Sequence, residues 1–124
     1  MSDPNQTLAQ MIRYFEEERH EMVEVMASEF TSMLLANKQR DGATQTLLVK
    51  GVRILAEVLS IRGKSKLAIQ ATSVLLRERK KLEKILAKTA PTLLSKLTPI
   101  EQDYRTIGSV FAKAGKASKA KKFF

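Results

Sequence analysis

The chain has 124 residues, of which 22 are Lys or Arg and 13 are Asp or Glu, so its formal net charge is +9. A chain of this length is expected to form a single domain with its own hydrophobic core, and the absence of Cys excludes disulfides, zinc–thiolate sites and cysteine nucleophiles. Gly and Pro are few, Trp is absent, and Leu, Ile, Val, Ala and Met dominate the apolar residues, a composition that favours helices over sheets, so we predict an all-α protein.

The first predicted helix begins after Asp3 and ends near Asn37. Asp is a favourable N-cap, and Pro4 suits the first helical position. The apolar residues that follow recur at helical spacing and form one broad face, which Arg19 and Glu29 interrupt. This face consists of Leu8, Met11, Ile12, Phe15, Met22, Val23, Met26, Phe30, Met33 and Leu34. Because the spacing is typical of a coiled-coil seam, we expect a homodimer or a higher oligomer; a monomeric bundle that covers the face internally is the alternative.

A loop over residues 38–42 precedes the second predicted helix, over residues 44–62. Apolar residues occupy two neighbouring stripes of this helix and leave one polar strip. The strip consists of Thr46, Lys50, Arg53, Glu57 and Ser60. A helix that is apolar over most of its circumference must be covered on several sides. We therefore expect this helix at the centre of the core.

The third predicted helix covers residues 65–89, with Ser65 as its expected N-cap. The fourth begins at a capping box over residues 98–101, and its apolar stripe ends at Phe111. Amphipathic helices joined by short connections are typical of a helical bundle. We predict a small bundle of three to four helices, formed by residues 1–111.

Residues 112–124 form a basic tail. Between Ala112 and Lys122 the tail contains only Ala, Gly, Ser and Lys. A segment without large apolar side chains cannot offset the entropy that it loses on ordering. We therefore expect a flexible tail, which contact with a polyanion can fold into an extension of the fourth helix.

The charge is unevenly distributed along the chain. Residues 1–41 hold four basic against eight acidic residues, a net charge of −4. Residues 42–90 hold eleven against three, a net charge of +8, and residues 91–124 hold seven against two, a net charge of +5. The basic part should attract a polyanion, and the acidic part should either repel that polyanion or fold back onto the basic part.

The densest charged stretch predicts a surface for nucleic-acid phosphates. On a helix, Arg77, Lys81, Lys84 and Lys88 share one stripe about 16 Å long, and Lys80 lies beside it. The stretch has no Asn, Gln or aromatic side chain, so it favours backbone contacts over base reading. The candidate contacts with DNA or RNA are Arg77, Arg79, Lys80, Lys81, Lys84, Lys88, Lys113, Lys116, Lys119, Lys121 and Lys122. A Lys-rich face that only keeps the bundle in solution is the alternative.

The last two residues, Phe123 and Phe124, have no use in phosphate binding, and we interpret them as a candidate contact with a protein partner. They match the aromatic pair of the sliding-clamp-binding peptide, but Ala117 and Ala120 replace its Gln and its aliphatic residue. Di-lysine and di-aromatic trafficking signals act beside a transmembrane segment, and the chain has no apolar run of that length. The remaining alternatives are packing of the rings on the bundle or on a second subunit, and insertion at an anionic membrane surface, which we do not expect.

Neither a catalytic site nor a metal site is expected. Glu17 and His20 have the i, i+3 spacing of di-metal carboxylate sites, but the chain has a single His, and a solvated helix face is the favoured interpretation. The five Gly residues are isolated, so no phosphate-cradling loop is formed. Nothing in the sequence resembles a nucleophile elbow. A helix-turn-helix centred on Gly63 fails because Leu59 and Arg62 occupy positions that require a small and an apolar residue.

We therefore predict a non-catalytic, oligomerising protein without a cofactor, which binds nucleic acid through phosphates with little sequence specificity. The alternative is a protein-interaction module, such as an assembly factor, an adaptor or a structural subunit, whose acidic N-terminal and basic C-terminal surfaces pair. The first residues have neither the basic nor the apolar region of a secretory signal. We expect a cytoplasmic or other intracellular location, including association with a nucleoid or a virion.

Overall fold

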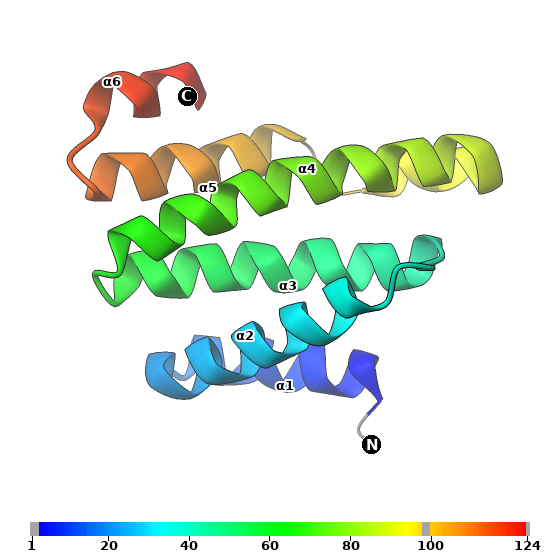
Figure 1. Cartoon of the computed structure of the whole chain (residues 1–124), viewed down its shortest axis with the longest axis horizontal. Coiled ribbons are helices and arrows are strands. Elements are labelled where there is room, and N and C mark those ends of the chain that lie inside the picture. Colours follow the sequence, from blue (N-terminus) through cyan, green and yellow to red (C-terminus); the bar gives the residue numbers. More distant parts are fainter. Residues whose placement is uncertain (1–2, 98–99, 124) are drawn as a thin grey trace.

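The computed structural model describes residues 3–97 and 100–123, and every regular element in these ranges is a helix. Figure 1 shows the helices stacked in chain order, from α1 and α2 on one side through α3 to α4, α5 and α6 on the other. The elements are α1 (Pro4–Glu16), α2 (His20–Ala36), α3 (Gly42–Ile61), α4 (Ser65–Thr89), the 3-10 helix η1 (Pro91–Lys96), α5 (Ile100–Lys113), α6 (Ala117–Ala120) and the 3-10 helix η2 (Lys121–Phe123). The all-α prediction is confirmed.

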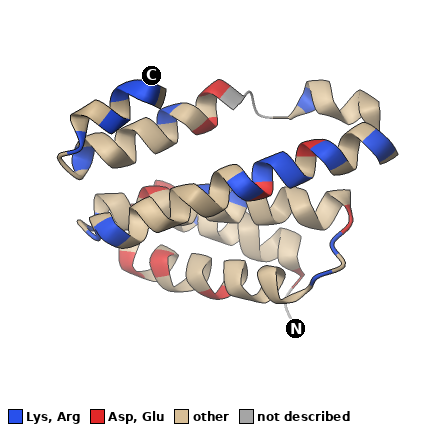
Figure 2. Ribbon diagram, turned by 45° about the horizontal axis from the view of Figure 1, so that its top comes forward, with Lys and Arg blue, Asp and Glu red and all other residues tan. Residues whose placement is uncertain are grey.

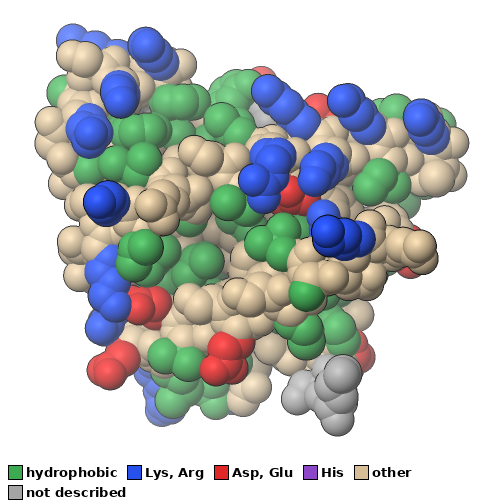
Figure 3. Space-filling view, viewed as in Figure 1, with side chains coloured by type: hydrophobic (Ala, Val, Ile, Leu, Met, Phe, Trp, Pro, Cys, Tyr) green, Lys and Arg blue, Asp and Glu red, His purple; other side chains and the backbone are tan. Residues whose placement is uncertain are grey.

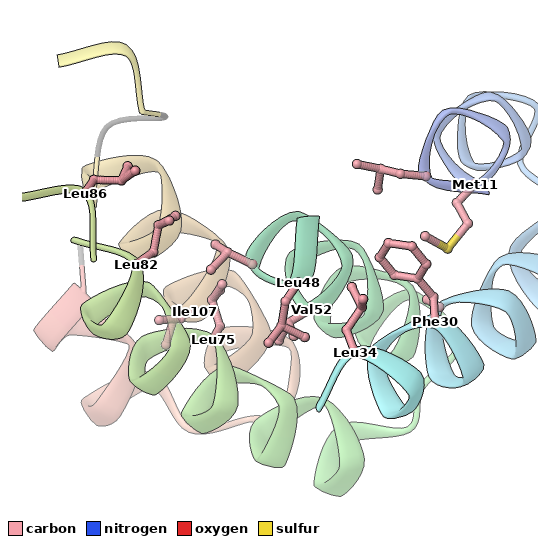
Figure 4. Close-up of a cluster of buried hydrophobic side chains, with 12 residues drawn as sticks. Met11, Phe30, Leu34, Leu48, Val52, Leu75, Leu82, Leu86 and Ile107 are labelled. Atoms are coloured by element: carbon pink, nitrogen blue, oxygen red, sulfur yellow. The ribbon is translucent and has the colours of Figure 1, made fainter. Parts of the chain in front are cut away.

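The prediction of one continuous first helix is wrong, because the chain breaks at Glu18 into α1 and α2. Glu18 has a φ of 60°, in the left-handed region, and the Arg19 N–H donates to the Tyr14 carbonyl at 2.9 Å as the chain turns. A straight helix over residues 4–37 would be about 50 Å long, whereas the 20 residues of α3 span about 30 Å. The break keeps both apolar halves on α3, and Figure 4 shows Met11 of α1 pointing toward Phe30 of α2.

The start of α1 is confirmed in detail. The Asp3 carboxylate accepts a hydrogen bond from the Asn5 N–H at 2.9 Å, and Pro4 occupies the first helical position. The start of α4 differs from the prediction, since Lys64 is the N-cap and Ser65 is already helical. The capping box over residues 98–101 includes positions that lie outside the described residues.

Helix α3 is the centre of the core, as predicted, because α1, α2, α4 and α5 all pack against it. Figure 4 shows Leu48 and Val52 of α3 between Leu34 on one side and Leu75 on the other. Gly51 permits the closest approach: a Cβ atom there would lie 2.7 Å from the Phe30 ring. The central position of α3 follows from its apolar circumference.

Two clusters of buried charge join α4 to its neighbours. Asp103 of α5, fully buried, accepts from Arg53 of α3 at 2.5 Å and from Arg79 of α4 at 3.0 Å. Glu78 of α4, equally buried, accepts from Arg40 of the α2–α3 loop at 2.9 Å. Because buried charges require partners, these two carboxylates determine how α4 is rotated against the bundle.

The C-terminal tail is ordered in the structure, which differs from the flexible tail that its composition predicts. The chain turns at Gly115, whose φ is +77°, and α6 and η2 pack on α5. Ala120 is buried, and the Phe123 ring stacks on Phe111 with centroids 5.8 Å apart and an interplanar angle of 4°. Phe123 supplies the large apolar side chain that residues 112–122 lack, so the tail has a core contact that stabilises its folded form.

Candidate nucleic-acid interface

The outer face of α4 presents a row of lysines. Lys80, Lys84 and Lys88 are exposed, and no Asp or Glu among the described residues forms an ion pair with them. Figure 2 shows that most Lys and Arg positions of α4 fall in its C-terminal half. The opposite faces of α4 pack on α3 and α5, so the lysine row can only point toward solvent. We call Lys80, Lys84 and Lys88 the basic stripe.

Arg77 and Lys81 belong to the same stretch but share a carboxylate. Arg77 donates to Glu78 at 2.8 Å, and the Lys81 ammonium lies 3.5 Å from the same Glu78 oxygen. Burial opposes ionisation of Glu78, but hydrogen bonds from Arg77 and Gln45 and the charges of Lys81 and Arg40 together hold its pKa below the ordinary value. Both side chains remain more than half exposed. They can therefore contact an anion, although Glu78 already compensates part of their positive charge.

Arg79 was one of the predicted phosphate contacts, but the structure buries its side chain. Its side chain is only 6% exposed and lies between α4 and α5, where it donates to Asp103 at 3.0 Å and to Glu83 at 3.0 Å. Sequence spacing misplaces this residue because the Lys- and Arg-rich run covers more than one helical turn, and one position of each turn faces the core. The role of Arg79 is structural.

The tail lysines lie at the other end of the same side of the molecule. Lys113, Lys116, Lys119, Lys121 and Lys122 are all exposed. Figure 3 shows Lys and Arg side chains over α4 and over α6, whereas Asp and Glu side chains are most prominent below, over α1 and α2. The two basic groups that the sequence predicted are therefore on one side of the bundle, separated by α5.

Three aromatic side chains meet beneath the tail. The Phe123 ring lies 6.0 Å from the Tyr104 ring, with an interplanar angle of 50°, and stacks on Phe111. The sequence pattern placed Phe111 at the end of the apolar stripe of the fourth predicted helix and left Phe123 with its neighbour as a separate signal. The signal that could have joined them is the Gly115 turn, which reverses the chain onto α5. Phe124 lies outside the described residues.

The acidic part of the chain folds back onto a basic turn, one of the two outcomes that the charge distribution predicted. Glu24 of α2 accepts from Lys64 at 2.6 Å and from Arg62 at 2.7 Å, both in the α3–α4 turn. The hydrogen bond from Lys64 lowers the pKa of Glu24, with Arg62 adding to the effect and partial burial opposing it. These contacts are far in sequence from the basic stripe and leave its charge uncompensated.

A polar groove lies between α3 and α5 and has a volume of about 680 Å³. Glu57, Glu101, Arg105 and Lys113 line it, so charges of both signs face one another. Burial raises the pKa of Glu57, a hydrogen bond from Thr106 and the charge of Arg53 oppose the rise, and the Asp103 charge adds to it. The mixed charge gives an anion little preference for the groove.

The i, i+3 spacing of Glu17 and His20 does not place the two residues on one helix face, because the helix breaks between them. Glu17 is the C-cap of α1 and His20 begins α2. Within the described ranges, no group of three or more His, Asp or Glu side chains is arranged to hold a metal ion.

None of the described helices combines the length and the apolar character needed to cross a membrane. Comparison with protein-family models, with curated protein sequences and with solved structures finds no match for this chain.

Proposed function

We propose that this protein binds nucleic acid through its phosphates, with little dependence on base sequence, and that it does so without catalysing a reaction. The observation that supports the proposal is the basic stripe: three exposed lysines on consecutive turns of α4, with no carboxylate among the described residues paired to them. The net charge of +9 adds a long-range attraction for a polyanion.

The geometry of the stripe suits phosphates rather than bases. From Lys80 to Lys88 the helix rises about 12 Å, the length of roughly three to four phosphates along one strand. Because α4 packs on α3 and α5, a duplex meets only its outer face, and lysine ammonium groups on that face bind phosphate oxygens without selecting a base. DNA and RNA remain equal candidates.

Charge reversal on the stripe tests this proposal. The variant Lys84→Glu/Lys88→Glu lowers the net charge by four, as does the control Lys38→Glu/Lys66→Glu, whose positions are exposed and lie outside the stripe. We expect the stripe variant to lose most of its affinity for a 20-base-pair duplex at low salt. Its plot of log K against log salt concentration should become shallower by about two, since each lost phosphate contact removes roughly 0.9 from the slope.

The choice of residues follows from the structure. Lys81 is avoided because its ammonium group lies beside the buried Glu78, so reversal there would perturb the fold as well as the surface. Equal loss in the stripe variant and in the control would show that net charge alone drives association. Absence of binding by the unmodified protein at low ionic strength would refute the proposal.

One observation favours the alternative of a protein-interaction module. Met22, Val25 and Met33 of α2 are exposed by 43%, 54% and 44%, and the same helix carries the exposed acidic residues Glu21 and Glu29. The α2 helix of a second copy could cover this face, and the basic C-terminal part of each copy would attract the acidic N-terminal part of the other. Light scattering at low and high salt, on protein freed of nucleic acid, tests it: a salt-sensitive oligomer that Met22→Lys/Met33→Lys abolishes supports the module.

A further inference from the structure

The end of the molecule formed by α5 and the tail differs from the basic stripe because it combines lysines with aromatic rings. We call Tyr104, Phe111 and Phe123 the aromatic cluster. The centroid of the Phe123 ring lies 6.0 Å from that of Tyr104 and 5.8 Å from that of Phe111. Phe111 and Phe123 are half-buried, while Tyr104 is 38% exposed. Part of the cluster is therefore open at the surface, although a small bundle would normally bury such rings.

Positive charge lies next to these rings. Lys121 and Lys122 directly precede Phe123 and are exposed, as is Lys119 one turn earlier. The acidic residues of α5 do not offset them: Asp103 is buried against Arg53 and Arg79, and Glu101 lines the groove between α3 and α5. Figure 3 shows hydrophobic side chains among Lys side chains on this end of the molecule.

We propose that the aromatic cluster and the tail lysines form a binding site for single-stranded nucleic acid. An exposed ring beside a row of cations is the arrangement with which proteins hold a single strand: the cations follow the phosphates, and unpaired bases stack on the rings. In a duplex the bases are already stacked on one another, so they are not available to stack on the rings. This inference rests on the proposed function and names the form of nucleic acid that this end of the molecule selects.

The ring geometry favours a base over a lipid. A membrane contact requires apolar rings that protrude, but the Phe123 ring lies flat on Phe111 and packs against the core cluster. The exposed aromatic residue of the cluster is Tyr104, which carries a hydroxyl and is therefore less suited to a lipid interior than a Phe ring. Anionic vesicles would attract the same lysines, so they form one arm of the test.

The sequence provides a direct probe, since the protein has no Trp and only two Tyr, Tyr14 and Tyr104. In a Tyr14→Phe background, Tyr104 is the single source of tyrosine fluorescence. We expect a thymidine 15-mer to quench this fluorescence on binding. A duplex of the same length and vesicles of phosphatidylglycerol and phosphatidylcholine should leave it within about a tenth of its initial value.

Affinities of labelled DNA, measured by anisotropy on the otherwise unmodified chain, separate stacking from charge. Tyr104→Leu should weaken the 15-mer about five- to 150-fold, the range that corresponds to loss of one base–aromatic stack, and change the duplex affinity less than twofold. Tyr104→Phe is the matched control: it keeps the ring and should retain the 15-mer affinity within about twofold. Thermal melts show whether each variant is folded.

The outcomes distinguish this site from the proposed function. Equal 15-mer affinity for Tyr104→Leu and Tyr104→Phe overturns the single-strand site, while a duplex affinity that still depends on Lys84 and Lys88 keeps the proposed function. If neither DNA form binds, both proposals fail. Quenching of Tyr104 by the vesicles but not by the 15-mer overturns the single-strand site in favour of a membrane contact.

Discussion

Asp103 is the position at which one atom-scale change should cost the fold most. Its carboxylate has no exposed surface and is bonded to two guanidinium groups, those of Arg53 on α3 and Arg79 on α4. Substitution Asp103→Asn keeps the shape of the side chain and removes its charge. The two cations, 16% and 6% exposed, then lose the carboxylate that compensates them inside the bundle.

The expected loss of stability is about 3–5 kcal/mol, the range for removing one partner of a buried ion pair. The loss should lie below the top of this range because Arg79 retains a second contact with Glu83 at 3.0 Å. A domain of this size has a free energy of unfolding of roughly 5–15 kcal/mol, so the variant loses a large share of it. The melting temperature should fall by roughly 10–20 °C.

Urea unfolding followed by far-UV circular dichroism measures the loss, with Glu17→Gln as a control. Glu17 pairs with Arg19 at 3.1 Å and with Arg13 at 3.9 Å, but all three side chains are exposed by 43% or more, so the control should change stability by less than about 1 kcal/mol. Adding Arg79→Met to Asp103→Asn removes one uncompensated cation and should cost less than the sum of the two single variants. A loss below about 1 kcal/mol for Asp103→Asn, or strict additivity in the double variant, would refute the argument that this carboxylate neutralises buried charge.

Three further predictions concern stability. Burial raises the pKa of Glu57 above its ordinary 4.5, so ionisation of Glu57 destabilises the fold as the pH rises from 4.5 through the raised value. The variant Glu57→Gln should therefore be more stable than the unmodified chain at pH 7, and it should lose that advantage on acidification. Glu78 has the opposite effect because its pKa is lowered: its ionised carboxylate stabilises the fold above about pH 4.5, and this contribution is lost as the pH falls through the lowered pKa. The variant Glu78→Gln should therefore be destabilised most at neutral pH. Parallel plots of stability against pH for the two variants would contradict both assignments. Gly51→Ala should lower the free energy of unfolding, measured by urea, by about 1–3 kcal/mol despite the higher helix propensity of Ala. The reason is that the new Cβ atom would lie 2.7 Å from the Phe30 ring. Adding Phe30→Leu, which makes the neighbouring side chain smaller, should recover part of the loss.

Residue patterns along the chain were sufficient for much of the architecture. The apolar circumference of α3 predicted its central position, and the end of α4 at Thr89 agrees with the end expected from its pattern. The Asp3 cap was equally readable. Each of these features depends on neighbours within one or two helical turns, so local spacing and side-chain chemistry determine it.

Contacts between distant residues decided what the patterns misjudged. The break at Glu18 lets α1 and α2 both pack on α3, and the tail packs on α5 with the Phe123 ring stacked on Phe111. Arg79 has the same side chain as an exposed arginine, but it is buried between α4 and α5, where it donates to Asp103.

For the candidate interface, the sequence by itself determined the sign and density of charge, and hence the kind of ligand that is attracted. The folded structure is needed to tell which of those charges are available, because Arg79 is buried against Asp103 of α5, and the buried Glu78 of α4 partly compensates Arg77 and Lys81 on the same helix. Only the fold placed Tyr104 beside Phe123. The physical reason is that charge is a sum over residues, whereas accessibility and ring contacts depend on how helices far apart in the chain pack together.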